Sequence, residues 1–261
     1  MRWTSRPPLW SSLETQPWHS LVQRYSRTSL TYESDRIDAI AGIAGQMYGS
    51  MDERNQYLAG LWRETLFEDM LWYSLRETPR SQPPDSDLPA PTWSWMSIML
   101  GVNSINYPCL VVEEIFPRLL NVHYQPRSVH LPLGHVAAGA YIEIEGQLTP
   151  AQATSRYIYI VDFRSTGKLP PLEVVWDPDR EPLTEAVETV FLLRMAYLRG
   201  GDLVKEAFLI LRPMPEVDLD DAVEVGCLKR AGYLEISRDE ASAPLLEGLQ
   251  MEEQYQELRM Y

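Results

Sequence analysis

The spacing of apolar residues changes once along this chain of 261 residues, at about residue 108. Before that point they recur every three or four positions, as Trp18, Leu21, Val22 and Tyr25 do, which is the period of one helix face. After it the period becomes two, and in 141–145 hydrophobic and acidic residues alternate, as in an antiparallel strand with one wet face. The change predicts an α+β protein with helices first and strands second.

The helical part is predicted over residues 1–78 and rests on three segments. Pro17 opens the first, where its fixed φ suits a first helical turn. Ser34 is the expected N-cap of the second, which covers about 37–44. A third helix is expected over 55–72, where Trp62 and Trp72 would share one broad face and belong to the core.

Residues 79–97 are predicted to form a Pro-rich loop that ends in the compact segment Trp93-Ser94-Trp95, because repeated proline sustains neither a helix nor a ladder. These two tryptophans could stack on a sugar or another ring ligand. They could instead clamp the helical part to the sheet, with one ring turned inward and the other toward solvent or another element. The clamp is the favoured interpretation.

The β part is predicted over 98–238, and residues 239–261 are expected to be an acidic tail or a frayed helix. The segment 187–198 is long for a strand and could be helical, and Gly200-Gly201-Asp202 is expected to be a turn between strands. The resulting architecture is a Trp-rich helical N-terminal part packed on a mainly antiparallel β-sandwich or barrel-like sheet system. The predicted strands cover 110–116, 121–124, 128–131, 141–148, 157–163, 172–176, 187–198, 207–211 and 223–236.

The net charge of the chain disfavours two classes of binding partner. With 23 basic and 37 acidic residues the formal net charge is −14, which disfavours binding to nucleic acid and to anionic membranes. No stretch approaches the roughly 20 apolar residues of a membrane span, and the N-terminus lacks the apolar core of a signal peptide. Cys109 and Cys227 are interpreted as two buried thiols in a reducing compartment, so a cytoplasmic location is expected.

No catalytic motif can be read from the chain. His130 and His135, with Cys109 and His123, could supply zinc ligands, but ordinary surface histidines are the favoured interpretation. Asp177 and Asp179 follow an apolar run and are expected to form a turn rather than an acid/base pair. The acidic cluster 218–221 lacks the Gly and distal Glu of a calcium loop. We therefore predict no catalytic residue, no cofactor and no metal ion.

Several segments in order resemble the region that follows the HET domain in fungal heterokaryon-incompatibility proteins. The resemblance covers about residues 18–236, and each segment alone would be weak. The later residues 174–177 and 229–233 are also similar to the C-terminal strands of that family. The ordered segments are 25–31 (YSRTSLT), 35–44 (DRIDAIAGIA), 57–62 (YLAGLW), 71–72 (LW) and 90–95 (APTWSW).

The HET domain itself, which in that family is linked to non-self recognition and cell death, is not part of this sequence. The chain is thus expected to be either a truncated product or a stand-alone relative of the C-terminal region. The resemblance implies no catalytic residue. It implies a scaffold in which Trp and Gly allow close packing and Asp35-Arg36 acts as a capping and pairing element. The candidate structural or interaction residues are Asp35, Arg36, Trp62, Trp72, Trp93 and Trp95.

Three functional hypotheses follow. The first is a non-enzymatic regulatory or recognition module related to heterokaryon incompatibility, whose partner is a protein, either a HET-domain chain or an incompatibility partner. The alternative is an enzyme or small-ligand-binding protein with a site between the helical part and the sheet, where Asp177, Asp179, His130 or His135 would converge. The third is a remnant without an independent function, which would not fold cooperatively.

Overall fold

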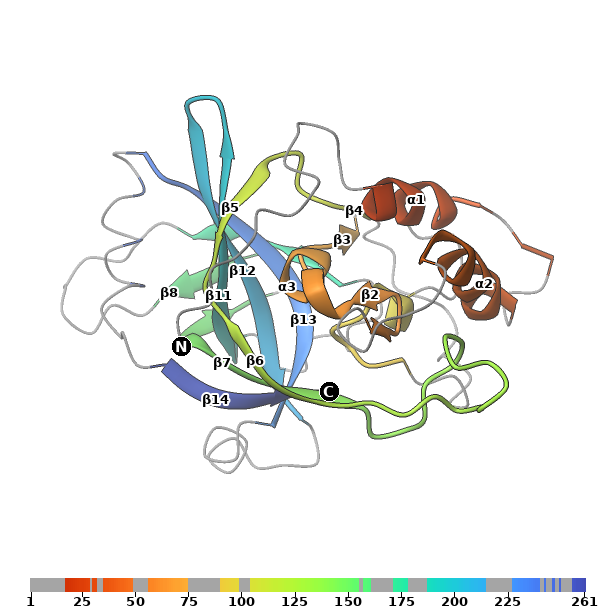
Figure 1. Cartoon of the computed structure of the whole chain (residues 1–261). Coiled ribbons are helices and arrows are strands. Elements are labelled where there is room, and N and C mark those ends of the chain that lie inside the picture. The colour runs from red at the N-terminus through yellow and green to blue at the C-terminus, as the bar shows by residue number, and fades with distance from the viewer. Residues whose placement is uncertain are drawn as a thin grey trace, which may run out of the picture.

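A computed structural model of the chain is mostly β, with few helices and one large sheet, in broad agreement with an α+β class (Figure 1). No helix among the described residues is long and apolar enough to cross a membrane. The structure describes residues 17–28, 30–31, 35–48, 56–74, 90–98, 104–154, 157–160, 171–177, 187–214, 227–239, 242, 246, 249 and 255–261. The expected N-cap Ser34, the Pro-rich part of the loop (79–89), Asp179 and the acidic cluster 218–221 lie outside these residues.

The first two predicted helices are confirmed. Helix α1 (Pro17–Tyr25) begins at the expected proline, and its apolar stripe buries Trp18 and Val22. Helix α2 (Arg36–Tyr48) buries Ile40 and Ala44, which are four residues apart on one face. In both helices the apolar face, repeated at the helical period, turns toward the interior of the molecule.

The helix predicted over 55–72 is wrong. Its described part contains two short antiparallel strands, β1 (Tyr57–Leu58) and β2 (Leu61–Trp62), followed by a 3₁₀ turn η3 (Arg63–Thr65) and one helical turn α3 (Leu66–Asp69). Between the strands Ala59 and Gly60 have φ of 48° and 90°, which no helix accepts. All of residues 57–62 are buried, so the spacing of the apolar residues there carries no information about period.

The remaining short elements lie between this segment and the large sheet. Strand β3 (Tyr73–Ser74) pairs with β4 (Ile105–Asn106). The Trp93-Ser94-Trp95 segment is a turn that enters a 3₁₀ helix, η4 (Trp95–Ile98). Because this backbone is not extended, the expected alternation of its tryptophans is wrong, and both rings are buried.

The large sheet is antiparallel except where β13 meets β14. Its pairings form a ring, because β7 pairs with β11, β11 with β12, β12 with β13, β13 with β14 and β14 again with β7. In this ring each member strand pairs with a neighbour on both sides over at least part of its length. The strands are β5 (Val111–Ile115), β6 (Arg118–His123), β7 (Tyr141–Ala153), β8 (Tyr157–Ile160), β9 (Leu172–Glu173), β10 (Val175–Trp176), β11 (Glu188–Gly200), β12 (Leu203–Pro213), β13 (Cys227–Ser237) and β14 (Tyr255–Met260).

Most of the strands that were predicted from alternating apolar residues are confirmed among the described residues. Residues 187–198, which could have been helical, belong to a strand. Residues 201–202 form the turn between β11 and β12, as expected. Two predictions are wrong. Residues 128–131 form a loop, and the end of the acidic tail is β14, whose pairing with β7 and β13 makes it part of the ring.

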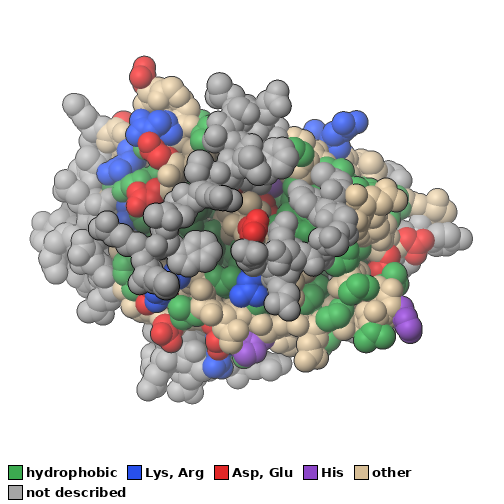
Figure 2. Space-filling view, viewed as in Figure 1, with side chains coloured by type: hydrophobic (Ala, Val, Ile, Leu, Met, Phe, Trp, Pro, Cys, Tyr) green, Lys and Arg blue, Asp and Glu red, His purple; other side chains and the backbone are tan. Residues whose placement is uncertain are grey.

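Two apolar clusters occupy the two faces of the sheet. The larger one joins one face, including Leu193, Leu209 and Met260, to the tryptophans of the N-terminal half. The smaller one covers the other face and includes Phe208 and Ile236. Neighbouring strand residues such as Phe208 and Leu209 thus belong to different clusters, as the alternation of side chains along a strand requires. Acidic and basic side chains lie intermixed on the surface over the sheet in Figure 2.

Candidate functional site

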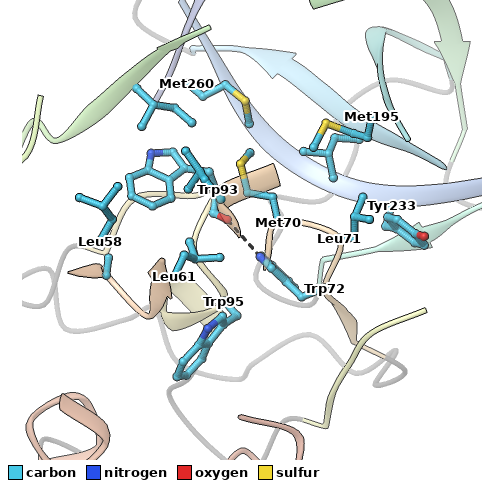
Figure 3. Packing of buried hydrophobic residues seen from close by; sticks show 14 of the residues in the cluster. Leu58, Leu61, Met70, Leu71, Trp72, Trp93, Trp95, Met195, Tyr233 and Met260 are labelled. Carbon is cyan, nitrogen blue, oxygen red and sulfur yellow. Dashed lines mark hydrogen bonds between the residues drawn. The ribbon is translucent and has the colours of Figure 1, made fainter. Parts of the chain in front are cut away.

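The four candidate tryptophans lie in one buried junction between the N-terminal half and the sheet. Trp62, Trp72, Trp93 and Trp95 are all in the larger cluster and almost fully buried. Figure 3 shows Trp72, Trp93 and Trp95 with Met70, below Met195 and Met260 of the sheet. The indole Nε1 of Trp72 donates a hydrogen bond to the carbonyl oxygen of Trp93 over 3.0 Å. The structure therefore places these residues in the core rather than on an exposed face.

Gly60 is the first fixed point of this junction. The indole Nε1 atoms of Trp18 and Trp95 both donate to its carbonyl oxygen, each over 2.9 Å. A Cβ atom at Gly60 would lie 2.8 Å from Cε2 of Trp95, so only glycine fits beneath that ring. Ser94 Oγ donates to the carbonyl oxygen of the neighbouring Ala59. Two tryptophans from distant segments are thus held by one two-residue turn.

Arg230 is the second fixed point. Its Nε donates to Asp177 Oδ2 over 3.0 Å, and its Nη1 donates to the carbonyl oxygen of Met70 over 2.6 Å. Its Nη2 donates to the carbonyl oxygen of Trp72, and the guanidinium carbon lies 3.4 Å from the centre of the Trp72 ring. Full burial lowers the pKa of Arg230, and the carboxylate of Asp177 acts against this shift. One guanidinium therefore joins β13, the residue after β10 and the turn after α3.

Thr92 links the same place to the end of β14. The backbone N–H of Arg230 donates to Thr92 Oγ1 over 3.0 Å. The backbone N–H of Thr92 donates to the carbonyl oxygen of Tyr261 over 2.9 Å, and the Thr92 hydroxyl donates to the same oxygen. The turn that carries Trp93 is consequently tied to both β13 and the residue after β14.

Asp69 is the third fixed point and is fully buried. Its Oδ2 accepts from the backbone N–H of Trp62 at 2.8 Å and from the Thr65 hydroxyl at 3.0 Å. Its Oδ1 lies 2.7 Å from Nε2 of His19, whose ring stacks on Tyr107 with centroids 3.8 Å apart. These contacts satisfy the carboxylate and join α1 to α3 and β2.

Asp35 and Arg36 lie at the start of α2. Asp35 is exposed and precedes the helix, whereas Arg36 is buried. Arg36 Nη2 donates to the carbonyl oxygen of Thr28 over 3.0 Å, and the Tyr25 hydroxyl donates to the carbonyl oxygen of Arg36 over 2.6 Å. Arg36 thus connects the end of α1 to the start of α2.

The described residues that were considered for catalysis or metal binding do not form a common site. Asp177 pairs with Arg230 in the core, His130 is exposed in a loop, and His135 Nε2 lies 3.9 Å from Asp38 Oδ1. Within the described ranges no group of three His, Cys, Asp or Glu side chains could hold a metal ion. Cys227 is buried as expected, but Cys109 is exposed, and both are free thiols.

Several buried tyrosines surround the junction. Burial raises the pKa of Tyr57, Tyr107 and Tyr233 well above its ordinary value, because each phenol would have to ionise away from water. Nearby acidic groups add to the shift, Asp69 for Tyr107 and Glu235 for Tyr233. The phenols therefore stay uncharged in the folded protein at neutral pH.

The sequence did not identify Gly60, Asp69, Thr92 or Arg230 as fixed points. Gly60, Thr92 and Arg230 do lie inside segments that carry the family resemblance, which is the one signal that could have pointed to them. Comparison with known proteins adds nothing to this picture: no family model, no curated protein and no solved structure matches the chain.

Proposed function

We propose that this chain is a non-enzymatic regulatory or recognition module related to the region after the HET domain of fungal heterokaryon-incompatibility proteins. The observation that carries the proposal is the convergence of the ordered segments named above. Trp62, Trp72, Trp93, Trp95, Gly60 and Arg36 come from those segments, and all except Arg36 meet in one buried junction. A shared scaffold is a physical reason for such segments to occur in a fixed order.

The chemistry of the junction supports a scaffold rather than an active site. The indole N–H groups of Trp18, Trp72 and Trp95 donate to backbone carbonyl oxygens, and Asp69 and Asp177 are occupied by partners inside the protein. A general acid or base must reach a proton of its substrate. Groups that are buried and already hydrogen-bonded stabilise the fold instead.

We further propose that the Trp-rich N-terminal segment forms a cover, partly helical, on one face of a barrel-like sheet system. The cluster that joins the tryptophans to Met195 and Met260 supports this arrangement. The cover would present a fixed outer surface to a partner, since its inner side is held by Gly60, Asp69 and Arg230. A cytoplasmic protein is the partner that we propose, because the net charge of −14 disfavours nucleic acid.

The test uses a recombinant HET domain from a fungal incompatibility protein as a probe. In the first experiment the purified chain is titrated into the labelled HET domain. In the second, the same HET domain is fused upstream of the chain, and the fusion is expressed in a filamentous fungus. We expect saturable binding, and cell death from the fusion but not from either part alone, scored with a vital dye. Absence of both binding and death, from a chain that unfolds cooperatively, would refute the proposal.

A fusion that carries Trp72→Ala serves as the control for the role of the junction. It removes a buried indole that donates to Trp93, so it is expected to unfold the module and abolish death. A fusion with Leu203→Ser, an exposed position in the sheet, is expected to act like the original. Cell death that survives Trp72→Ala unchanged would show that the folded module is not required.

A further inference from the structure

A hairpin arm projects from the sheet beside α2 and displays apolar side chains to solvent. The arm comprises residues 124–137, between β6 and β7, and Figure 1 shows it as the yellow-green segment below α2. Val129 is 84% exposed and Leu131 is 54% exposed, which makes Val129 the most exposed large hydrophobic residue among those described. Exposed apolar residues that gather on one element are a feature of interaction sites.

The arm is held in shape by its own hydrogen bonds. Pro126 and Val136 form a bridge, and the backbone N–H of Arg127 donates to the carbonyl oxygen of His135 over 2.8 Å. At the tip the N–H of Leu131 donates to the carbonyl oxygen of Ser128 over 3.3 Å. A preformed loop loses little further conformational entropy on binding, so its exposed side chains can contribute more of their burial energy.

The base of the arm is anchored in the core and on α2. Val136 is buried in the larger cluster, and Leu133 packs against that cluster. His135 Nε2 lies 3.9 Å from Asp38 Oδ1 of α2. The arm therefore contacts the helix that carries the resemblance segment 35–44, while Val129 and Leu131 are exposed.

The charge of this region differs from that of the rest of the chain. Residues 115–142 contain no Asp or Glu in a chain whose net charge is −14. Of their two arginines and three histidines, Arg118, His123 and His135 lie against the carboxylates of Glu145, Glu143 and Asp38. Arg127 and His130 flank the apolar tip and are exposed. Figure 2 shows green hydrophobic surface next to purple histidine at this end of the molecule. A partner that matches the tip must combine an apolar socket with carboxylates.

We propose that the arm docks into a protein segment that presents apolar side chains together with acidic ones, with Val129 and Leu131 as the anchors. The proposal rests on the function proposed above, to which it adds the contact surface and the chemistry of the partner. An anionic membrane would offer similar charge, but two aliphatic residues without an aromatic one are a small anchor, and the overall charge repels such a surface.

The experiment uses a display library of random 12-residue peptides as the probe for the purified full chain. We expect enrichment of peptides that mix Asp or Glu with Leu, Ile or Phe. A synthetic peptide of the enriched consensus is then titrated by fluorescence anisotropy. The double variant Val129→Ser/Leu131→Ser should raise Kd at least tenfold, and His130→Glu should raise it several-fold, with a smaller effect at high salt.

The matched control is Val111→Ser/Leu203→Ser, which removes one valine and one leucine that are also exposed, 54% and 44%, from the sheet. It should change Kd by less than twofold. No enrichment, or a peptide that binds the arm variant as well as the original chain, would overturn the proposal. Binding to phosphatidylserine vesicles without any peptide binding would overturn it in favour of a membrane contact.

The HET-domain titration separates this proposal from the function on which it rests. If the HET domain binds the chain and the arm variant equally, the module role stands and the arm is not its contact surface. If the arm selects acidic and apolar peptides while the HET domain does not bind, the arm is a docking site and the partner belongs to another class of protein.

Discussion

The guanidinium carbon of Arg230 lies 3.4 Å from the centre of the Trp72 ring, and the same guanidinium donates a hydrogen bond to the Trp72 carbonyl oxygen. The two residues are 158 positions apart in the sequence. A single buried charge therefore fixes both the ring and the backbone of the Trp-rich segment against β13. The carboxylate of Asp177 neutralises that charge, so the three residues form one unit.

Replacement of Arg230 by methionine should be among the most destabilising single changes in the chain. It would leave the Asp177 carboxylate buried without its cation and two backbone carbonyl groups without their donor. We expect the free energy of unfolding to fall by about 3–5 kcal/mol, measured by urea denaturation. Arg199→Met removes an exposed pair with Glu113 and should leave the urea midpoint nearly unchanged. Equal effects of the two variants would contradict the role given to Arg230.

Alanine substitutions at Gly60 and Gly42 should change stability in opposite directions. Gly60→Ala places a Cβ atom 2.8 Å from the Trp95 ring at a φ of 90°, so it should destabilise the fold by more than about 1 kcal/mol and weaken both indole hydrogen bonds. Gly42→Ala lies within α2, where a Cβ meets nothing within 4 Å, and should stabilise by about 0.5–1 kcal/mol. Thermal unfolding followed by tryptophan fluorescence measures both. A tolerated Gly60→Ala would show that the indoles do not depend on this turn.

The elements predicted correctly from the sequence are those that have one buried apolar face and one solvent-exposed polar face. The apolar stripes of α1 and α2 and the alternation in 141–145 each leave polar residues on the opposite face. The spacing of the apolar residues therefore shows whether the segment has the period of a helix or of a strand. Residues 57–62 have no wet face, and the left-handed Ala59-Gly60 turn was hidden among residues that also suit a helix. Trp62 and Trp72 were predicted to be core and are buried, whereas Trp93 and Trp95, expected to face opposite ways, are both buried. Their shared junction could not be predicted, because it depends on Arg230, which contacts Trp72 and Thr92 only in the folded chain.

Alkaline pH should unfold the protein through its buried tyrosines. Because the folded-state pKa of Tyr57, Tyr107 and Tyr233 is raised, their contribution to stability is complete below about pH 10, the ordinary pKa of tyrosine. As pH rises above that value the unfolded chain ionises first, and stability is lost toward the raised pKa. Absorbance at 295 nm should therefore show a late tyrosine phase that coincides with loss of the folded-state circular dichroism.

Tyr107→Phe tests this account at one site. The Tyr107 hydroxyl is buried and has no hydrogen-bond partner within the described part of the chain, while its ring stacks on His19. Removing the hydroxyl should be neutral or slightly stabilising at pH 7 and should move alkaline unfolding to higher pH. Loss of more than about 1 kcal/mol at neutral pH would indicate that the hydroxyl is satisfied by a group outside the described residues.

Deletion of residues 255–261 should abolish cooperative unfolding, because β14 is the strand through which β13 and β7 are joined. The deletion would expose the edges of both strands and remove Leu258 and Met260 from the larger cluster. It would also remove the carbonyl oxygen of Tyr261, which receives both the backbone and the hydroxyl donor of Thr92. Tyr255→Ser, at a half-exposed position of the same strand, should leave the transition intact. Urea titration followed by near-UV circular dichroism measures the effect. If residues 255–261 are a dispensable tail, the shortened chain still unfolds in a sharp transition. If β14 is required to close the ring, the sharp transition is lost.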